Sequence, residues 1–112
     1  MNPITASFRQ ARPQQLSEAL QSARNYTLRL FDCLADAGFD VPAQVPHIAT
    51  INPPLWELGH MAWFAEWYVL RQAASSHPAD AIGHSLLTRG DDWFDSNPVA
   101  HRARWTLDLP NA

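Results

Sequence analysis

Residues 52–71 have the sequence NPPLWELGHMAWFAEWYVLR, which combines two opening prolines, three tryptophans and one histidine. Proline fits the first turn of a helix, and Asn52 is suited to cap the helix that follows. Five side chains then recur at steps of four and three and so share one helical face: Trp56, His60, Trp63, Trp67 and Leu70. The spacing therefore predicts a helix from Pro53 to about Ala74, with His60 on its aromatic face.

A second apolar row makes this helix hydrophobic over much of its circumference. Met61, Phe64 and Tyr68 form that row, on another side from the tryptophans. A helix that is apolar on several sides is typically covered on several sides. We therefore expect it to be buried between neighbouring elements.

Composition and charge narrow the class of protein. The chain has 112 residues, 46% hydrophobic and 17% charged, which predicts one small domain with a core. The net charge of −3 and the lack of a basic run argue against nucleic acid as a partner. Ionisable side chains within residues 52–71 argue against a membrane helix, which needs about 20 mainly apolar residues. With one cysteine and no apolar signal-peptide core, we expect a cytoplasmic protein without an intrachain disulfide.

An earlier segment predicts another long helix. Pro13 suits its first turn, and Gly38 suits its end because glycine adopts the left-handed conformation at low cost. Apolar or small residues recur between them at helical spacing: Leu16, Leu20, Ala23, Thr27, Leu30 and Leu34. We expect a helix from about Pro13 to Ala37, with Cys33 as a small buried residue close to its apolar face.

The sequence after Ala74 has weaker periodicity. Residues 75–78 (Ser-Ser-His-Pro) predict a break, residues 79–87 a short helix, and residues 90–92 (Gly-Asp-Asp) a turn. Three histidines are expected in exposed loops or at helix ends: His77, His84 and His101. No alternating strand pattern is present, so we predict an all-α fold that lacks at least one long helix needed to cover residues 53–74.

The order of residues in the tryptophan-rich helix resembles the signature of the DinB-like N-terminal domain of ergothioneine-type sulfoxide synthases. The pattern Pro-x-x-Trp-x-Leu-x-His-x-x-Trp-Phe-x-Glu is carried here by Pro53, Trp56, Leu58, His60, Trp63, Phe64 and Glu66. Residues 54–60 and 67–71 are more similar to the selenoneine synthase branch of that family. Residues 93–96 and 101–105 also resemble a linker in these enzymes, so that the resemblance extends over most of the chain.

This resemblance implies a DinB-like four-helix bundle, of which residues 1–112 form the N-terminal part, without the last long helix and without a second domain. It implies a non-haem iron(II) enzyme that uses oxygen to join hercynine to a thiol or, in the selenoneine branch, to a selenosugar. In the family, three histidines hold the iron: one corresponds to His60, and a His-x-x-x-His pair lies on the last long helix. The five histidines here are nowhere four residues apart. We therefore expect this chain alone to be inactive and to hold no iron stably.

Each candidate residue has a second interpretation. His60 is either a metal ligand or a packing residue, and the tryptophans beside it are expected in the core. Arg102 and Arg104 either bind a substrate carboxylate as bidentate forks or lie on a solvated surface. Glu57 is near enough in sequence to contact His60, whereas Glu66 is expected to make a structural or substrate-loop contact.

The family arrangement also implies that the connection, residues 39–51, is an ordered loop near the metal end of the bundle. His47 is then expected at the mouth of the pocket without binding the metal. Two other functions stay open: a non-catalytic helical module that pairs with another chain, and a fragment of a DinB-like thiol transferase that uses zinc or nickel. Uncovered apolar surface on the tryptophan-rich helix also predicts self-association.

Overall fold

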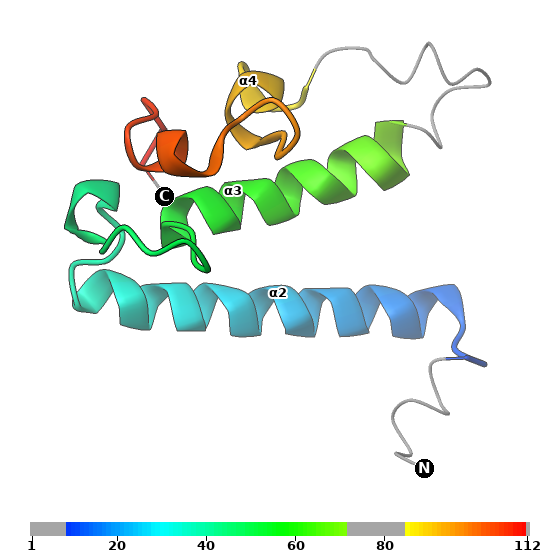
Figure 1. Ribbon diagram of the computed structural model, residues 1–112. Coiled ribbons are helices and arrows are strands. Elements are labelled where there is room, and N and C mark those ends of the chain that lie inside the picture. Colours follow the sequence, from blue (N-terminus) through cyan, green and yellow to red (C-terminus); the bar gives the residue numbers. More distant parts are fainter. Residues whose placement is uncertain (1–8, 72–84, 112) are drawn as a thin grey trace. The chain divides into compact units, whose positions relative to one another are not determined.

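Helices make up the regular structure of the described residues, and no strand is found among them, which confirms the all-α prediction at this level. The computed structural model describes residues 9–71 and 85–111 and divides into two units, Met1–Cys33 and Leu34–Ala112. The elements in chain order are α2 (Pro13–Asp36), the 3-10 helix η1 (Pro42–Gln44), α3 (Pro54–Ala65), the π-helix η2 (Glu66–Arg71), α4 (Gly90–Phe94) and the 3-10 helix η4 (His101–Trp105) (Figure 1). Within this part of the chain, no helix is both long and apolar enough to span a membrane.

The helix predicted from Pro13 to about Ala37 is confirmed, because α2 begins at Pro13 and ends at Asp36. Gly38 follows with a φ of 87°, a conformation that other residues adopt only at a cost. Its backbone N–H donates to the carbonyl of Ala35, as in a glycine-terminated helix. The predicted stop signal therefore acts as expected.

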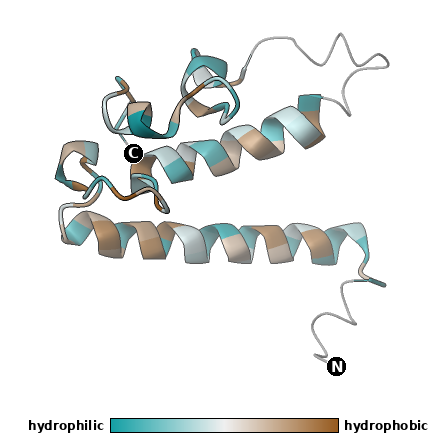
Figure 2. Cartoon of the chain, in the orientation of Figure 1, coloured by the Kyte–Doolittle hydropathy of each residue, from teal (hydrophilic) through white to brown (hydrophobic). Residues whose placement is uncertain are grey.

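The apolar row along α2 appears as brown bands in Figure 2. Three of its leucines are exposed, and no other described element of the first unit covers them: Leu16, Leu20 and Leu30. The prediction that Cys33 is buried was wrong, because its side chain is exposed. Its position close to an apolar row did not place it beneath a packed neighbour.

The tryptophan-rich helix begins at Pro54, one residue after the predicted start, and is α-helical to Ala65. The chain continues as the π-helix η2 to Arg71, and residues 72–74 of the predicted helix lie outside the described residues. A π-helix has wider turns than an α-helix and is often found at functional sites. Side chains beyond Ala65 therefore depart from the simple spacing of four and three.

The prediction that Asn52 caps this helix was wrong. The N-cap is Pro53, and no side chain accepts a capping hydrogen bond from the backbone N–H groups of the first turn. The Asn52 side-chain amide instead donates to Glu57 Oε1 at 2.6 Å. Proline's fixed φ sets the start of the helix without an oxygen cap.

The core of the second unit forms where α3 meets α4 (Figure 1). It consists of Trp56, Trp63, Trp93 and Phe94, with Trp67, Leu107 and Leu109 packed against it. Trp56 is almost fully buried, with 1% of its surface exposed. The expectation that the tryptophans of α3 build the core is confirmed for Trp56 and Trp63, while Trp67 is half-buried.

The second apolar row is not covered by described neighbouring elements, although the composition of the helix alone predicted such cover, and it instead forms part of the uncovered apolar surface expected for this chain. Met61, Phe64 and Tyr68 are all exposed. The Phe64 and Tyr68 rings pack on each other, with centroids 4.6 Å apart. No described element of the second unit covers this row, and its side chains therefore face solvent in groups.

The segment after residue 84 differs from its prediction. Residues 85–87, expected to end a short helix, are not helical, and His77 and His84 lie outside the described residues. Gly90-Asp91-Asp92, expected as a turn, begins α4 instead. The left-handed residue here is Arg89, with a φ of 66°, so the change of chain direction falls one residue before the glycine.

Candidate metal-ligand site around His60

His60 lies on α3 with its ring hydrogen-bonded to the backbone of α4. Its Nδ1 is 2.7 Å from the carbonyl oxygen of Phe94. A carbonyl oxygen only accepts hydrogen bonds, so Nδ1 carries the proton. In the neutral ring, Nε2 then has a free lone pair, which is the form that binds a metal or accepts a proton.

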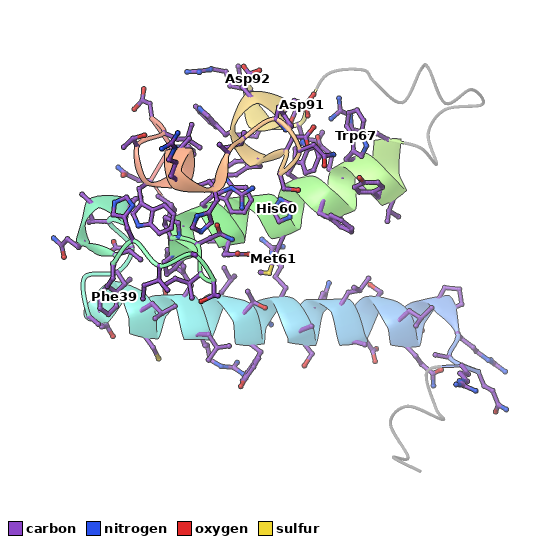
Figure 3. The ribbon with its side chains drawn as sticks, viewed as in Figure 1. Phe39, His60, Met61, Trp67, Asp91 and Asp92 are labelled. Carbon is purple, nitrogen blue, oxygen red and sulfur yellow. The ribbon has the colours of Figure 1, made fainter. Side chains whose placement is uncertain are left out.

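The imidazole of His60 is held among aromatic rings. Its centroid is 4.7 Å from that of Trp56, with the two planes 12° apart, and 6.0 Å from that of Trp63. The Phe64 ring meets its edge at 6.1 Å. Figure 3 labels His60 on α3, and the ring is only partly buried. The site is therefore apolar around the ring and open to at least one side.

Gly59 allows α4 to approach α3 beside His60. A Cβ at this position would collide with the ring of Phe94. The Phe94 ring thus lies directly against the backbone of α3, and the backbone carbonyl of Phe94 bonds to His60. Only glycine leaves room for this packing without a shift of one helix.

Asp91 ties the first turn of α4 to α3 and η2. It accepts a hydrogen bond from Trp63 Nε1 at 2.7 Å, and bonds from Arg71 Nη1 at 2.8 Å and Nη2 at 3.1 Å. The hydrogen bonds from Arg71 are the main cause of a lowered pKa for Asp91, and they outweigh partial burial, which acts in the opposite direction. Trp63 and the charge of Arg71 lower the pKa further. The carboxylate is therefore held in its ionised, accepting form.

Glu66 is the buried acid of η2. Its carboxylate accepts a hydrogen bond from the backbone N–H of Leu86 and one from the Ser85 hydroxyl at 3.2 Å, and Arg71 Nη1 lies 3.9 Å away. This confirms that Glu66 makes a structural contact. It joins the chain before α4 to the end of the long helix.

A small cavity lies between Glu66 and the start of α4. Its volume is about 150 Å³, and its lining is mainly apolar and includes Gly59, Trp63 and Phe94. The Glu66 carboxylate is the charged group of the lining, and Ser85 and Leu86 already engage it. The cavity therefore offers shape but few unused polar groups.

Arg104 is a structural residue of the second unit. Its Cζ lies 4.0 Å from the ring centroid of Trp56, and its Nη1 donates to Asn52 Oδ1 at 3.0 Å. Its Nη2 donates to the backbone carbonyl of Val99 at 3.0 Å. Burial lowers the pKa of Arg104, and the charge of Glu57 acts in the opposite direction. The interpretation of Arg104 as solvated surface was wrong, because the aromatic stack and these bonds occupy its guanidinium.

Arg102 and Glu57 lie apart from the His60 ring contacts. Arg102 is exposed, as its surface interpretation predicts. Glu57 accepts the bond from Asn52, and the ring nitrogen Nδ1 of His60 is taken by Phe94. The possible Glu57 contact with His60 is therefore replaced by a backbone carbonyl.

His47 and His101 both contact Trp105. The His47 ring stacks on it at 4.5 Å, and His101 meets it edge-on at 4.9 Å. His101 Nε2 donates to the carbonyl of Ile51 at 2.6 Å, while the indole of Trp105 donates to Val45. These two histidines thus fasten η4 to the connection, and the placement of His47 at a pocket mouth stays a prediction.

His60 by itself fits the role of one metal ligand. Residues 9–71 and 85–111 contain no group of three or more His, Cys, Asp or Glu side chains that could hold a metal ion. Sequence reasoning missed the Phe94 carbonyl that bonds to His60, the close approach at Gly59, and Asp91, which bonds to Trp63 and Arg71. Gly59 lies inside the quoted motif and could have signalled a close approach, whereas a backbone carbonyl leaves no mark in a sequence.

No protein-family model matches this chain, and no curated protein is significantly similar to it.

Proposed function

We propose that this chain is the N-terminal, iron-ligand-contributing part of a DinB-like enzyme of the ergothioneine or selenoneine synthase type, with His60 as one ligand through Nε2. The observation that carries the proposal is the bond from His60 Nδ1 to the Phe94 carbonyl, which leaves Nε2 unprotonated in the neutral ring. The choice of this enzyme family rests on the resemblance of residues 53–66 to its signature. In a bundle of this type, two further histidines are required from a long helix that these residues do not supply.

The chemistry of such a site explains the need for three ligands. Iron(II) held by three protein groups keeps open positions for oxygen and for a thiolate or selenolate. The residues described here have a more limited part: the aromatic rings fix the plane of His60, and the α4 backbone fixes its proton. Arg102, which is an exposed residue, is the remaining candidate for a substrate carboxylate.

The test compares this chain with the product of a reading frame that extends beyond codon 112 and encodes a His-x-x-x-His helix. We expect the 112-residue chain to bind Fe(II) under anaerobic conditions no better than an ordinary surface histidine does. We expect the longer protein to bind one iron and to form product from hercynine, oxygen and a thiol or selenosugar. His60→Ala should remove both properties, because a site reduced to two ligands loses affinity and geometry.

His101→Ala is the matched control for this test. It removes an imidazole that bonds to the Ile51 carbonyl and contacts Trp105, and neither of these contacts involves His60. Iron content should then stay at one per chain in the longer protein. Full activity of the His60→Ala variant would overturn the proposal, and so would a reading frame that ends at codon 112 with no such helix encoded nearby.

A second candidate function is a helical module that pairs with another chain. The observation in its favour is the group of exposed apolar side chains on α3 and η2: Met61, Phe64, Tyr68, Val69 and Leu70. Apolar groups of this kind mark interaction surfaces in many proteins. A stable complex with a partner, formed equally well by His60→Ala, would favour this function over the enzyme.

A further inference from the structure

We infer that α4 is a positioning element for His60, in which Asp91 holds the Phe94 carbonyl against Nδ1 and thereby keeps Nε2 free of its proton. The inference deepens the proposed function and rests on it for the use to which Nε2 is put. Asp91 lies three residues before Phe94 and makes its side-chain bonds to Trp63 and Arg71, so it acts on His60 through the backbone. Figure 3 labels His60 on α3 and Asp91 in α4.

The first step is the choice of tautomer. A neutral imidazole can carry its proton on either nitrogen, and the bond that one nitrogen makes decides which form dominates. A carbonyl at 2.7 Å from Nδ1 favours the form with the proton on Nδ1. A hydrogen bond of ordinary net strength shifts such an equilibrium roughly two- to tenfold.

The second step is that α4 does not hold its own position. It has five residues, and a helix so short is unstable unless other parts of the protein support it. Apart from the His60 bond itself, its support comes from α3 and η2, through the bonds of Asp91, the bond from Trp56 Nε1 to the Trp93 carbonyl at 2.7 Å, and the packing of the Phe94 ring on Gly59. Asp91 supplies the charged contact among these.

The third step is the rigidity of the Asp91 contact. Arg71 grips both carboxylate oxygens, and 9% of its side chain is exposed. A bidentate pair fixes direction as well as distance. Because Arg71 lies at the end of η2, the wider π-helical turns set where this fork meets α4. Through Arg71 and Asp91, the π-helix therefore helps to position the Phe94 carbonyl.

The experiment observes the ring nitrogens of His60 directly. The whole 112-residue chain is labelled with nitrogen-15 at histidine, and long-range proton–nitrogen correlations are recorded without metal at about pH 8, where an ordinary imidazole is neutral. His60→Gln identifies the signals. We expect a protonated Nδ1 and an unprotonated Nε2 in the original chain. In Asp91→Asn we expect the ratio of this tautomer to the other to fall at least twofold.

Asp92→Asn is the matched control. Asp92 is the next residue, is exposed, and pairs only loosely with Arg89 at 3.7 Å, so its removal should leave the His60 spectrum unchanged. Arg71→Lys is the second variant for the case in which Asp91→Asn does not fold, because lysine keeps the charge and loses the fork. We expect it to lower the tautomer ratio by less than Asp91→Asn does.

Two results would overturn the inference: a dominant Nε2–H tautomer in the original chain, or an unchanged tautomer ratio in a folded Asp91→Asn or Arg71→Lys variant. These results are independent of the iron test, since no metal is present. A longer protein that binds no iron, together with the expected tautomer pattern, would refute the proposed function and leave the role of Asp91 in fixing the ring intact.

Discussion

At the scale of single residues, contacts between α3 and α4 depend on small details of side-chain size. Gly59 is the sharpest case, because the Phe94 ring occupies the space that any larger residue would need. Glycine inside a helix costs about 1 kcal/mol relative to alanine. Its presence in the middle of α3 is therefore explained by packing rather than by helix preference.

We predict that Gly59→Ala lowers the free energy of unfolding, even though alanine is the better helix former. Overpacking against the Phe94 ring costs about 1–3 kcal/mol. The gain in helix propensity from glycine to alanine is about 1 kcal/mol, which is smaller over most of that range. In a Phe94→Leu background the same change should be neutral or stabilising, because the ring is gone. A urea-unfolding cycle of the four chains measures this coupling. Additive effects of the two substitutions would contradict the contact between Gly59 and Phe94.

Sequence reasoning at this scale found His60 but not what surrounds it. The spacing of Trp56, His60 and Trp63 was sufficient to place the three on one helix face, and their rings do lie together. The partner of His60 Nδ1 is a backbone carbonyl, which every residue possesses. The two arginines proposed to bind substrate differ in their surroundings, because Arg102 is exposed whereas Arg104 contacts the Trp56 indole and the Val99 carbonyl. Periodicity in the sequence carries no information on such contacts.

At the scale of elements, the long helices were predictable and the short ones were not. Pro13 and Gly38 bracket α2 closely, since proline and glycine act through local backbone geometry. The five-residue helices α4 and η4 are shorter than the window in which a hydrophobic period can be recognised. The change from α-helix to π-helix at Glu66 was likewise not predictable, because contacts of Glu66 and Arg71 with residues 85–91 accompany it.

The attachment of α4 predicts a specific dependence of stability on pH. The pKa of Asp91 is lowered in the folded chain, mainly by Arg71, so the folded state binds this proton less tightly than the unfolded state does. The contribution of Asp91 is then fully present above its unfolded pKa of about 3.9 and is lost as the pH falls through the lower, folded pKa. We expect about 1 kcal/mol, because 41% of the Asp91 side chain is exposed and solvent screens the pair.

The measurement is the free energy of unfolding in urea for the original chain and for Asp91→Asn over a series of pH values. The difference between the two should be constant near neutral pH and shrink below about pH 4. Asp92→Asn, which changes an exposed neighbour, should show a much smaller difference. A difference for Asp91→Asn that persists undiminished in strong acid would show that its carboxylate is not the source.

At the scale of the whole molecule, the described elements leave many large apolar side chains exposed. The sequence predicted a helix covered on several sides, yet the row of Met61, Phe64 and Tyr68 is exposed in the second unit. Composition reports how much apolar surface a chain carries. It does not report which segment covers that surface. For this reason the sequence could predict that the long helix needs neighbours but not which elements those neighbours are.

We predict that the 112-residue chain self-associates through this row. The side chains of Met61, Phe64, Tyr68, Val69 and Leu70 are between 46% and 59% exposed. Monomeric proteins rarely leave more than a few hundred Å² of contiguous apolar surface uncovered. Sedimentation velocity should show mass that rises with concentration, and a hydrophobic dye should bind. The double variant Phe64→Gln with Leu70→Gln should reduce both signals.

Ile48→Gln provides the control for self-association, since Ile48 is 46% exposed but lies in the connection before α3 rather than on the helix. It removes one exposed aliphatic side chain of the same degree of exposure and should leave both signals near those of the original chain. If every exposed apolar residue contributed equally, the control would weaken association about half as much as the double variant. A larger effect of the α3 and η2 substitutions assigns the interface to the long helix, whereas a concentration-independent monomer that melts cooperatively and binds no dye would refute the prediction.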